Sequence, residues 1–431
     1  MNIPRIDLPR IVVLGCGFAG IKFIQKIDSK KYQVVLLDKH NYHTFQPLMY
    51  QVATSGLEPD SITYPIRKIF KGKKHFHFRK TEVLNVDHGE KVVNTTIGAV
   101  QYDHLVVALG ATNNFFGNEQ FAQMTNPMKS LTESLDLRSM ILQNFEDALN
   151  MTDIEEQNRL MNFVVIGAGA TGVELAGALS ELKDHVLPTD YPDLDVRRMQ
   201  IHLVEGSERV LSAMSENASA KSAKFLKKMG VNIWLETRVE SYDGQSVVTN
   251  NGVFESRSVI WSAGVKAVTI DGIDLKGSKS GRVPVDGFSE TLNQKHVYAL
   301  GDIAEMIDEK NPYGYPMLAS VAGQQGDWLA KNLNQKAKWK SKKLKPFVYK
   351  DQGTMATIGR NKAVVDLKRF HFSGYIAWLI WMFVHLMLLV EYRNRLIVFA
   401  NWTWRYIKYD RGSRLIIREY ERKQAKEKVQ E

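Results

Sequence analysis

The fold of this chain is decided by the stretch RIVVLGCGFAG, residues 10–20. Its apolar run predicts a buried strand, and its three glycines predict a tight turn that opens a helix reaching Ile27. A second strand over 34–37 ends in an acid, Asp38. Glycine lets a backbone approach a pyrophosphate closely, and an acid about 20 residues on can bind ribose hydroxyls. The stretch therefore predicts a dinucleotide-binding unit that uses Gly15, Gly17, Gly20 and Asp38.

The same pattern returns at FVVIGAGATG, residues 163–172. The predicted contacts of this second loop are Gly167, Gly169, Gly172 and, at the end of the next strand, Glu205. A carboxylate there accepts from a 2′-hydroxyl and repels a 2′-phosphate, which favours NADH over NADPH. The nearby Arg209 argues weakly the other way.

Two such loops in one chain imply two bound dinucleotides. We expect FAD at the first and a nicotinamide dinucleotide at the second, with hydride transfer between them. The predicted fold class is α/β, with two Rossmann-like domains and a C-terminal amphipathic region. The expected boundaries are 1–117 with 280–345 for FAD, 118–279 for NADH, and 346–431 for membrane attachment.

Composition limits the remaining choices. The 431 residues carry 57 Lys and Arg against 47 Asp and Glu, a net charge of +10, which suits nucleic acid or anionic lipid as a partner. With 44% hydrophobic residues, the chain is not expected to be disordered. A single cysteine, Cys16, excludes a disulfide framework and a CxxC centre. The N-terminus lacks an apolar signal-peptide core, so we expect the protein to face the cytoplasm.

The C-terminal region decides between these partners. The apolar stretch 376–390 is about 22 Å long as a helix, too short for about 30 Å of hydrocarbon, and His385 interrupts it. Aromatic and basic residues then alternate over 393–409, as is typical of the headgroup boundary. We therefore predict monotopic attachment to the cytoplasmic face of the membrane, and no nucleic-acid partner. The alternative is a helix packed on the body of the protein or on a second copy, and a homodimer is left open.

Several segments resemble the type II (non-proton-pumping) NADH:quinone dehydrogenases of the two-dinucleotide flavoprotein superfamily. They are DKHNYHTFQPLMYQVATSGLEP (38–59), YDHLVVALGATNNFFG (102–117), IWSAGV (260–265), VYALGDIAE (297–305) and PMLASVAGQQGDWLAKNL (316–333). The resemblance implies an enzyme that oxidises NADH through non-covalent FAD and reduces a membrane quinone.

The resemblance also assigns individual roles. Asp302 would contact the flavin's ribityl–pyrophosphate, Gln46 and Pro47 the flavin, and Val83 the adenine half. Glu174 matches a glutamate near flavin and quinone, although an acid in a first helical turn is also favoured by the helix dipole. The other implied cofactor contacts are Phe18, Ala19, Lys39, Ala111, Ala263, Gly264, Ala319 and Val321.

Two departures from the family pattern concern the quinone. The family's AQxAxQ segment reads ASVAGQ here, so Ser320 replaces the first glutamine and Gln324 remains. We expect Glu174, Gln324 and Ser320 to serve the quinone. Some relatives carry a lysine on the first C-terminal helix, whereas residues 370–390 contain none, and Trp381 stands near that place.

Other functions explain the sequence less well. Sulfide:quinone oxidoreductases and disulfide reductases need cysteines that this chain lacks. A ferredoxin-type reductase would not need the aromatic C-terminus. A non-catalytic, NADH-responsive flavoprotein with a basic partner-binding surface stays open. No metal site is predicted, because the pair His75 and His77 lies in a basic, strand-like segment without nearby acids.

Overall fold

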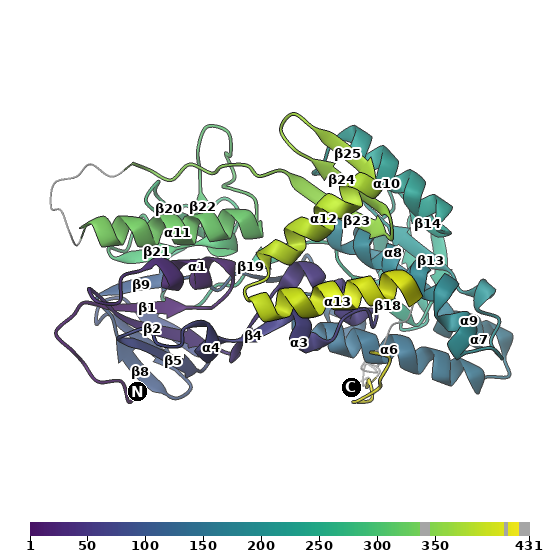
Figure 1. Ribbon diagram of the computed structural model, residues 1–431, viewed down its shortest axis with the longest axis horizontal. Helices are drawn as coiled ribbons and strands as arrows, with labels where there is room; N and C mark the ends of the chain where they lie inside the picture. The colour runs from purple at the N-terminus through teal and green to yellow at the C-terminus, as the bar shows by residue number, and fades with distance from the viewer. Residues whose placement is uncertain (337–344, 409–412, 422–431) are drawn as a thin grey trace, which may run out of the picture. The chain divides into compact units, whose positions relative to one another are not determined.

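The structure is a computed structural model that describes residues 1–336, 345–408 and 413–421 (Figure 1). Residues 334–346 are rich in lysine, which predicts a solvated loop, and most of this stretch lies outside the described residues. The chain forms two compact units. The first comprises Met1–Thr44, Thr63–Thr112 and Val265–Asp351, and the second comprises Phe45–Ile62, Asn113–Gly264 and Gln352–Glu431. These divisions differ from the predicted domain boundaries, since 45–62 and the C-terminal region join the second unit and 265–279 joins the first.

The first unit is built on a parallel sheet in the order β21-β9-β1-β2-β5. Its strands are β1 (Arg10–Leu14), β2 (Gln33–Asp38), β5 (Phe76–Lys80), β9 (His104–Val107) and β21 (Val297–Ala299). β1 and β2 are buried along almost their whole length, as expected of parallel strands covered on both faces. Helix α1 (Phe18–Lys26) packs closely on α11 (Ala319–Lys336), because Gly326 offers no Cβ to collide with the Ala19 carbonyl.

The second unit repeats this plan with the parallel order β11-β18-β12-β13-β14. The strands are β11 (Asn126–Pro127), β12 (Phe163–Ile166), β13 (Ile201–Val204), β14 (Val231–Trp234) and β18 (Ser258–Trp261). The surrounding helices are α6 (Leu131–Leu149), α7 (Ile154–Met161), α8 (Ala170–His185) and α10 (Glu216–Lys228). A capping box starts α6, where Ser130 and Glu133 each accept the other's backbone N–H.

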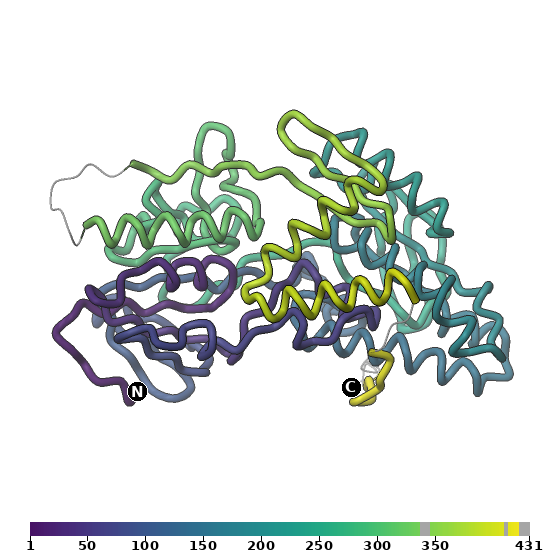
Figure 2. Tube along the Cα trace, viewed as in Figure 1, coloured from purple at the N-terminus to yellow at the C-terminus, as the bar shows by residue number. Residues whose placement is uncertain are grey.

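The C-terminal region belongs to the second unit (Figure 2). It begins with an antiparallel sheet of β23 (Thr354–Gly359), β24 (Lys362–Asp366) and β25 (His371–Gly374). β23 packs on α8, since Gly177 lets the Ile358 carbonyl approach the helix. Two helices follow, α12 (Tyr375–Leu388) and α13 (Tyr392–Lys408). The short helices α2 (Met49–Ala53) and α3 (Pro59–Ile62) complete this side, packing on α8 and α13 respectively.

Smaller elements complete both units. The antiparallel sheets are β6-β7-β8 (Val83–Asp87, Val92–Thr95, Gly98–Gln101) and β15-β16-β17 (Val239–Tyr242, Ser246–Thr249, Gly252–Glu255). The remaining short strands are β3 (Tyr42–Thr44), β4 (Thr63–Pro65), β10 (Ala111–Asn113), β19 (Val265–Ala267), β20 (Val283–Val285) and β22 (Ala304–Met306). The remaining short helices are α4 (Ile66–Ile69), α5 (Glu119–Met124) and α9 (Leu187–Asp190), with 3₁₀ turns η1 (Gln46–Leu48), η2 (Val196–Arg198) and η3 (Gly301–Ile303).

Candidate active site

The first glycine loop lies between β1 and α1, as predicted. Gly15 has φ +95°, and a Cβ there would meet the Ala108 carbonyl oxygen at 2.5 Å. A Cβ on Gly20 would lie 2.0 Å from the Gly15 carbonyl oxygen, so these two glycines are required by the loop itself. Gly17, by contrast, has nothing within 4 Å of a built Cβ and stands at the N-cap of α1. This open position at a helix N-terminus fits a phosphate.

The acid of the first unit is fixed against the same loop. Asp38 accepts the Cys16 N–H at 2.7 Å through one oxygen and the His40 N–H at 2.7 Å through the other. Burial raises the pKa of Asp38, and the two N–H groups oppose this effect. The carboxyl is thereby held at the C-terminal end of β2 beside the open glycine, where a ribose would lie.

The second loop has the same construction. Gly167 has φ +99° and abuts the Ala263 backbone, and Gly172 lies against the Gly167 carbonyl. Gly169 is open, at the N-cap of α8. Glu205 accepts the Ala168 N–H at 2.6 Å and both the N–H and the hydroxyl of Ser207 at 2.9 Å.

Arg209, near this site, is bonded within its own loop. Its guanidinium donates to the carbonyls of Met214 and Ser212, at 3.1 and 2.9 Å. The preference for NADH over NADPH stays a prediction.

The other predicted cofactor residues divide between the units. Asp302 lies on η3 in the first unit, and Val83 and Ala111 begin β6 and β10. Phe18 opens α1 and meets the His43 ring edge-on at 5.5 Å. Gln46 and Pro47 form η1 in the second unit, where Gln46 accepts from Lys129 at 3.4 Å. The remaining predicted cofactor residues lie in or directly after other elements: Ala19 on α1, Lys39 after β2, Ala319 and Val321 on α11, and Ala263 and Gly264 after β18.

Two of the three predicted quinone residues belong to the first unit and already have partners. The Ser320 hydroxyl lies 2.9 Å from the Tyr349 hydroxyl. The Gln324 amide donates to the Lys350 carbonyl at 2.9 Å and accepts the Lys350 N–H at 3.0 Å. Gln324 on α11 therefore holds the backbone of Lys350 through both of its amide atoms.

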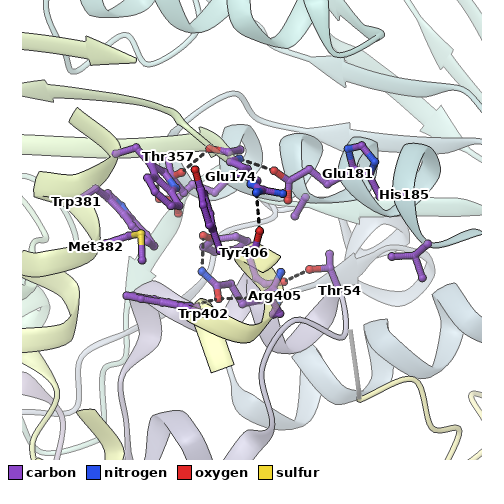
Figure 3. A pocket seen from close by; sticks show the side chains of 17 residues that line it. Thr54, Glu174, Glu181, His185, Thr357, Trp381, Met382, Trp402, Arg405 and Tyr406 are labelled. Carbon is purple, nitrogen blue, oxygen red and sulfur yellow. Dashed lines mark hydrogen bonds between the residues drawn. The ribbon is translucent and has the colours of Figure 1, made fainter. Parts of the chain in front are cut away.

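The third, Glu174, lies in a cavity of the second unit with a volume of about 100 Å³ (Figure 3). Helix α8 supplies Glu174, Ala178, Glu181 and His185, and α2 supplies Tyr50 and Gln51. The hairpin β23–β24 adds Thr357, Gly359 and Arg360. The C-terminal helices add Trp378, Trp381, Met382, Trp402, Arg405 and Tyr406. The cavity thus combines an apolar aromatic wall with several ionisable groups.

Glu174 is 9% exposed and its carboxyl accepts the Thr357 N–H at 3.3 Å. Burial raises its pKa to about 8, even though this N–H and the neighbouring Trp381 indole favour the charged form. The Trp381 N–H itself makes no hydrogen bond of ordinary geometry within the described residues. Glu174 is therefore a carboxylic acid that holds its proton near neutral pH, which suits a proton donor.

A polar network that the sequence did not reveal forms the floor of the cavity. The Gln51 side-chain oxygen accepts from Trp402 at 2.9 Å and from Arg405 at 3.3 Å, while its amide donates to the Tyr50 hydroxyl at 2.8 Å. Arg405 also donates to the Gly56 carbonyl at 2.8 Å. Burial raises the pKa of the Tyr50 hydroxyl and lowers that of Arg405.

This network corrects one expectation. Trp402 and Arg405 were expected at a headgroup boundary, but both turn inward on the face of α13 that also buries Asn394 and Val398. Trp381 is likewise buried on α12. Tyr409 lies outside the described residues, as does much of the charged tail.

The opposite faces of the two helices are apolar and open. On α12 the exposed side chains are Tyr375, Ile376, Leu379, Phe383, Met387 and Leu388. On α13 the exposed large apolar side chains outside the cavity lining are Tyr392, Leu396, Phe399, Trp404 and Ile407, and Arg393, Thr403 and Lys408 are exposed on the same helix. His385 does not interrupt this surface, because it is buried against the Trp381 ring at 4.1 Å and bonds the Trp381 carbonyl. None of the described helices has the length and apolar character that crossing a bilayer requires.

Comparison with known proteins places this architecture in a class and then in a family. The family described as pyridine nucleotide-disulphide oxidoreductase matches residues 9–326, which is the class that the twin glycine loops define. The NDH2 C-terminal domain matches residues 352–408. The "Type II NADH:quinone oxidoreductase Ndh" of Mycobacterium tuberculosis is 33% identical over 94% of this chain and 89% of its own length. The chain therefore belongs to the type II NADH:quinone oxidoreductase family.

Other comparisons agree on the fold. A relative from Haemophilus influenzae, named "Type II NADH:quinone oxidoreductase", is 27% identical over 84% of this chain and 87% of its own length. A solved structure of NDH2 from Plasmodium falciparum in complex with NADH superposes with a TM-score of 0.86 at 20% identity, covering 95% of this chain and 100% of that one. The sulfide:quinone oxidoreductase of Aquifex aeolicus gives 0.67 at 14% identity over 90% and 92% of the two chains.

Proposed function

We propose that this protein is a membrane-attached flavoenzyme that oxidises NADH and reduces a membrane quinone without pumping protons. The observation that carries the proposal is the pair of glycine loops, each with an open middle glycine beside a fixed carboxylate. Membership of the family supports assigning a particular dinucleotide to each loop. FAD goes to the first loop and NADH to the second.

Bound FAD would supply the chemistry of accepting two electrons from NADH and releasing them to a quinone. The chain's own part is binding and orientation. Gly17 and Asp38 would hold the FAD pyrophosphate and ribose, with Asp302 at the ribityl side. Gly169 and Glu205 would hold NADH, and the first unit and the central part of the second are accordingly the proposed FAD and NADH domains.

The quinone end is proposed at Glu174, whose neutral carboxyl faces a cavity with an aromatic wall. Ser320 and Gln324 are retained as proposed quinone residues. The Gln324 amide is bonded to Lys350, so the proposed role of Gln324 is to position the backbone at Lys350. The Ser320 hydroxyl, which lies beside the Tyr349 hydroxyl, is then the group more available to the quinone.

Membrane attachment is proposed through the exposed apolar faces of α12 and α13, at the cytoplasmic side. A homodimer is a separate hypothesis, which sedimentation of the detergent-solubilised protein tests directly.

The proposed activity is tested by steady-state NADH oxidation in lipid, with ubiquinone and menaquinone analogues as acceptors. We expect quinone to accelerate NADH oxidation over many turnovers. A slow, stable complex with NADH that quinone does not discharge would instead identify a non-catalytic NADH-responsive flavoprotein.

A further inference from the structure

One face of helix α8 carries a row of ionisable groups into the cavity. Glu174, Glu181 and His185 are separated by seven and then four residues, which places them on the same side of the helix. Their exposure rises along the row: Glu174 is buried, Glu181 is half-buried and His185 is exposed. Ala178, between the two acids, leaves room beside the helix. The row thus runs from a buried acid to solvent (Figure 3).

The two ends of the cavity differ in character. Trp381 and Met382 lie at the end away from His185, as Figure 3 shows. Around His185, a neighbouring hollow is lined by Glu181, Asp184, Met229 and the turn residues Arg360, Asn361 and Lys362. Glu181 and His185 border both spaces. An apolar substrate fits the aromatic end, whereas protons would come from the polar end.

Other charged and titratable groups face this row from the β23–β24 turn, α13 and α2. Glu181 accepts the Arg360 backbone N–H from the β23–β24 turn. From α13, Arg405 lies in the field of Glu181, and the Arg360 guanidinium stacks on Tyr406 at 4.0 Å. From α2, the Tyr50 hydroxyl lies in the fields of both Glu174 and Glu181. Arg360 and Arg405 place positive charge near Glu181, and the Tyr50 hydroxyl lies near both carboxyls.

We propose that Glu181 and His185 form a proton relay that reprotonates Glu174 from solvent during quinone reduction. The relay rests on the proposed function. When Glu174 gives its proton to a quinone oxygen it becomes a carboxylate. One proton then passes from the His185 imidazolium through Glu181 and intervening water to Glu174, and His185 takes a proton from solvent. No electron moves in these steps.

The distances require water between the groups. Seven residues of helix span about 10 Å and four span about 6 Å, more than a direct hydrogen bond covers. The cavity offers about 100 Å³ to the centres of water-sized molecules, several times the roughly 10–15 Å³ that one water needs on the same measure. Two or three waters at each gap would therefore complete the path.

The test is stopped-flow reoxidation of the NADH-reduced holoenzyme by a quinone, from pH 6 to 9, with Glu181→Gln and His185→Gln. Glutamine can still accept the Arg360 N–H but carries no proton that it can release. We expect Glu181→Gln to slow reoxidation by roughly tenfold, less than the 10²-fold or more expected for a direct donor, with a larger solvent deuterium effect. Glu181→Asp should recover most of the rate, and added imidazole should rescue His185→Gln.

Asp184→Asn is the matched control, because Asp184 is exposed on the same helix and borders only the outer hollow. Its reoxidation should equal the parent's, and reoxidation by ferricyanide, which takes no protons, should be unchanged in every variant. If Glu181→Gln kept the parent's reoxidation rates and pH profile, the relay would be overturned and the proposed function would stand. An equal loss with ferricyanide would also overturn the relay, because it would reveal a structural defect. A parent protein that cannot reduce quinone would overturn the proposed function, and the relay with it.

Discussion

Glu205 is held by three hydrogen bonds from Ala168 and Ser207, so its carboxylate stands in one place at the end of β13. A fixed negative charge there repels a 2′-phosphate. We predict that Glu205→Ser lowers the NADH/NADPH ratio of kcat/KM by about tenfold or more, corresponding to about 1.4 kcal/mol or more of discrimination. The control is Glu240→Ser, an exposed acid on β15. An unchanged ratio would mean that another group reads the ribose.

The open glycines give a prediction that separates cofactor binding from folding. A Cβ at Gly17 meets no protein atom within 4 Å, whereas one at Gly20 lies 2.0 Å from a carbonyl oxygen. Gly17→Ala should therefore keep the parent's circular dichroism yet purify with less FAD. Gly20→Ala should disturb the loop itself and lower the unfolding midpoint even of the apoprotein. Full FAD content in Gly17→Ala would argue against a phosphate at this position.

The buried acid predicts a pH dependence of stability. The pKa of Glu174 rises from 4.5 to about 8 on folding, so the unfolded chain ionises first as pH increases. The folded state should lose up to about 1.4 kcal/mol per pH unit relative to Glu174→Gln between about pH 5 and pH 8, with no further loss above pH 8. Urea unfolding of both proteins across this range measures the difference. Parallel curves would show that Glu174 is not a buried neutral acid.

At the scale of elements, the glycine loops could be predicted because strand, turn, helix and acid lie within about 30 residues of sequence. The cavity could not, because Tyr50, Thr357 and Trp402 come from three distant segments. Helix α13 shows the reason in detail. Both of its faces carry aromatic and basic residues, so only the packing of Asn394, Val398 and Trp402 against the body reveals which face is covered.

This packing also changes how membrane attachment should be tested. Removing residues 370–431 would delete Trp381, Trp402 and Arg405 from the cavity, so activity and attachment would fail together. Phe383 is 65% exposed on α12 and lies outside the cavity lining. Phe383→Glu should weaken binding to vesicles containing anionic phospholipid by several-fold while ferricyanide reduction persists.

The control for this substitution is Val253→Glu, at another exposed apolar position, on β17, where Val253 is 56% exposed. It should leave vesicle flotation unchanged. Equal flotation of Phe383→Glu and the parent would show that the exposed face of α12 does not meet lipid.

At the scale of the whole molecule, the protein is a flavoenzyme of the type II NADH:quinone oxidoreductase family, and its quinone-reducing end is proposed at the Glu174 cavity. The two glycine loops and the family membership support the dinucleotide sites, and the buried Glu174 in its aromatic cavity supports the proposed quinone end. The positive charge of the chain, +10, fits a protein that works beside anionic lipid. The single cysteine, buried in the first glycine loop, leaves sulfide chemistry without its nucleophile.

The most direct test of this claim is an anaerobic two-step titration of the purified, full-length protein in lipid, followed by the visible absorption of its flavin. We expect stoichiometric NADH to bleach the flavin band and a quinone analogue then to restore it, with quinol formed in equal amount. A band that NADH does not bleach, or that stays bleached when quinone is added, would show that the protein does not pass electrons from NADH to quinone through its flavin.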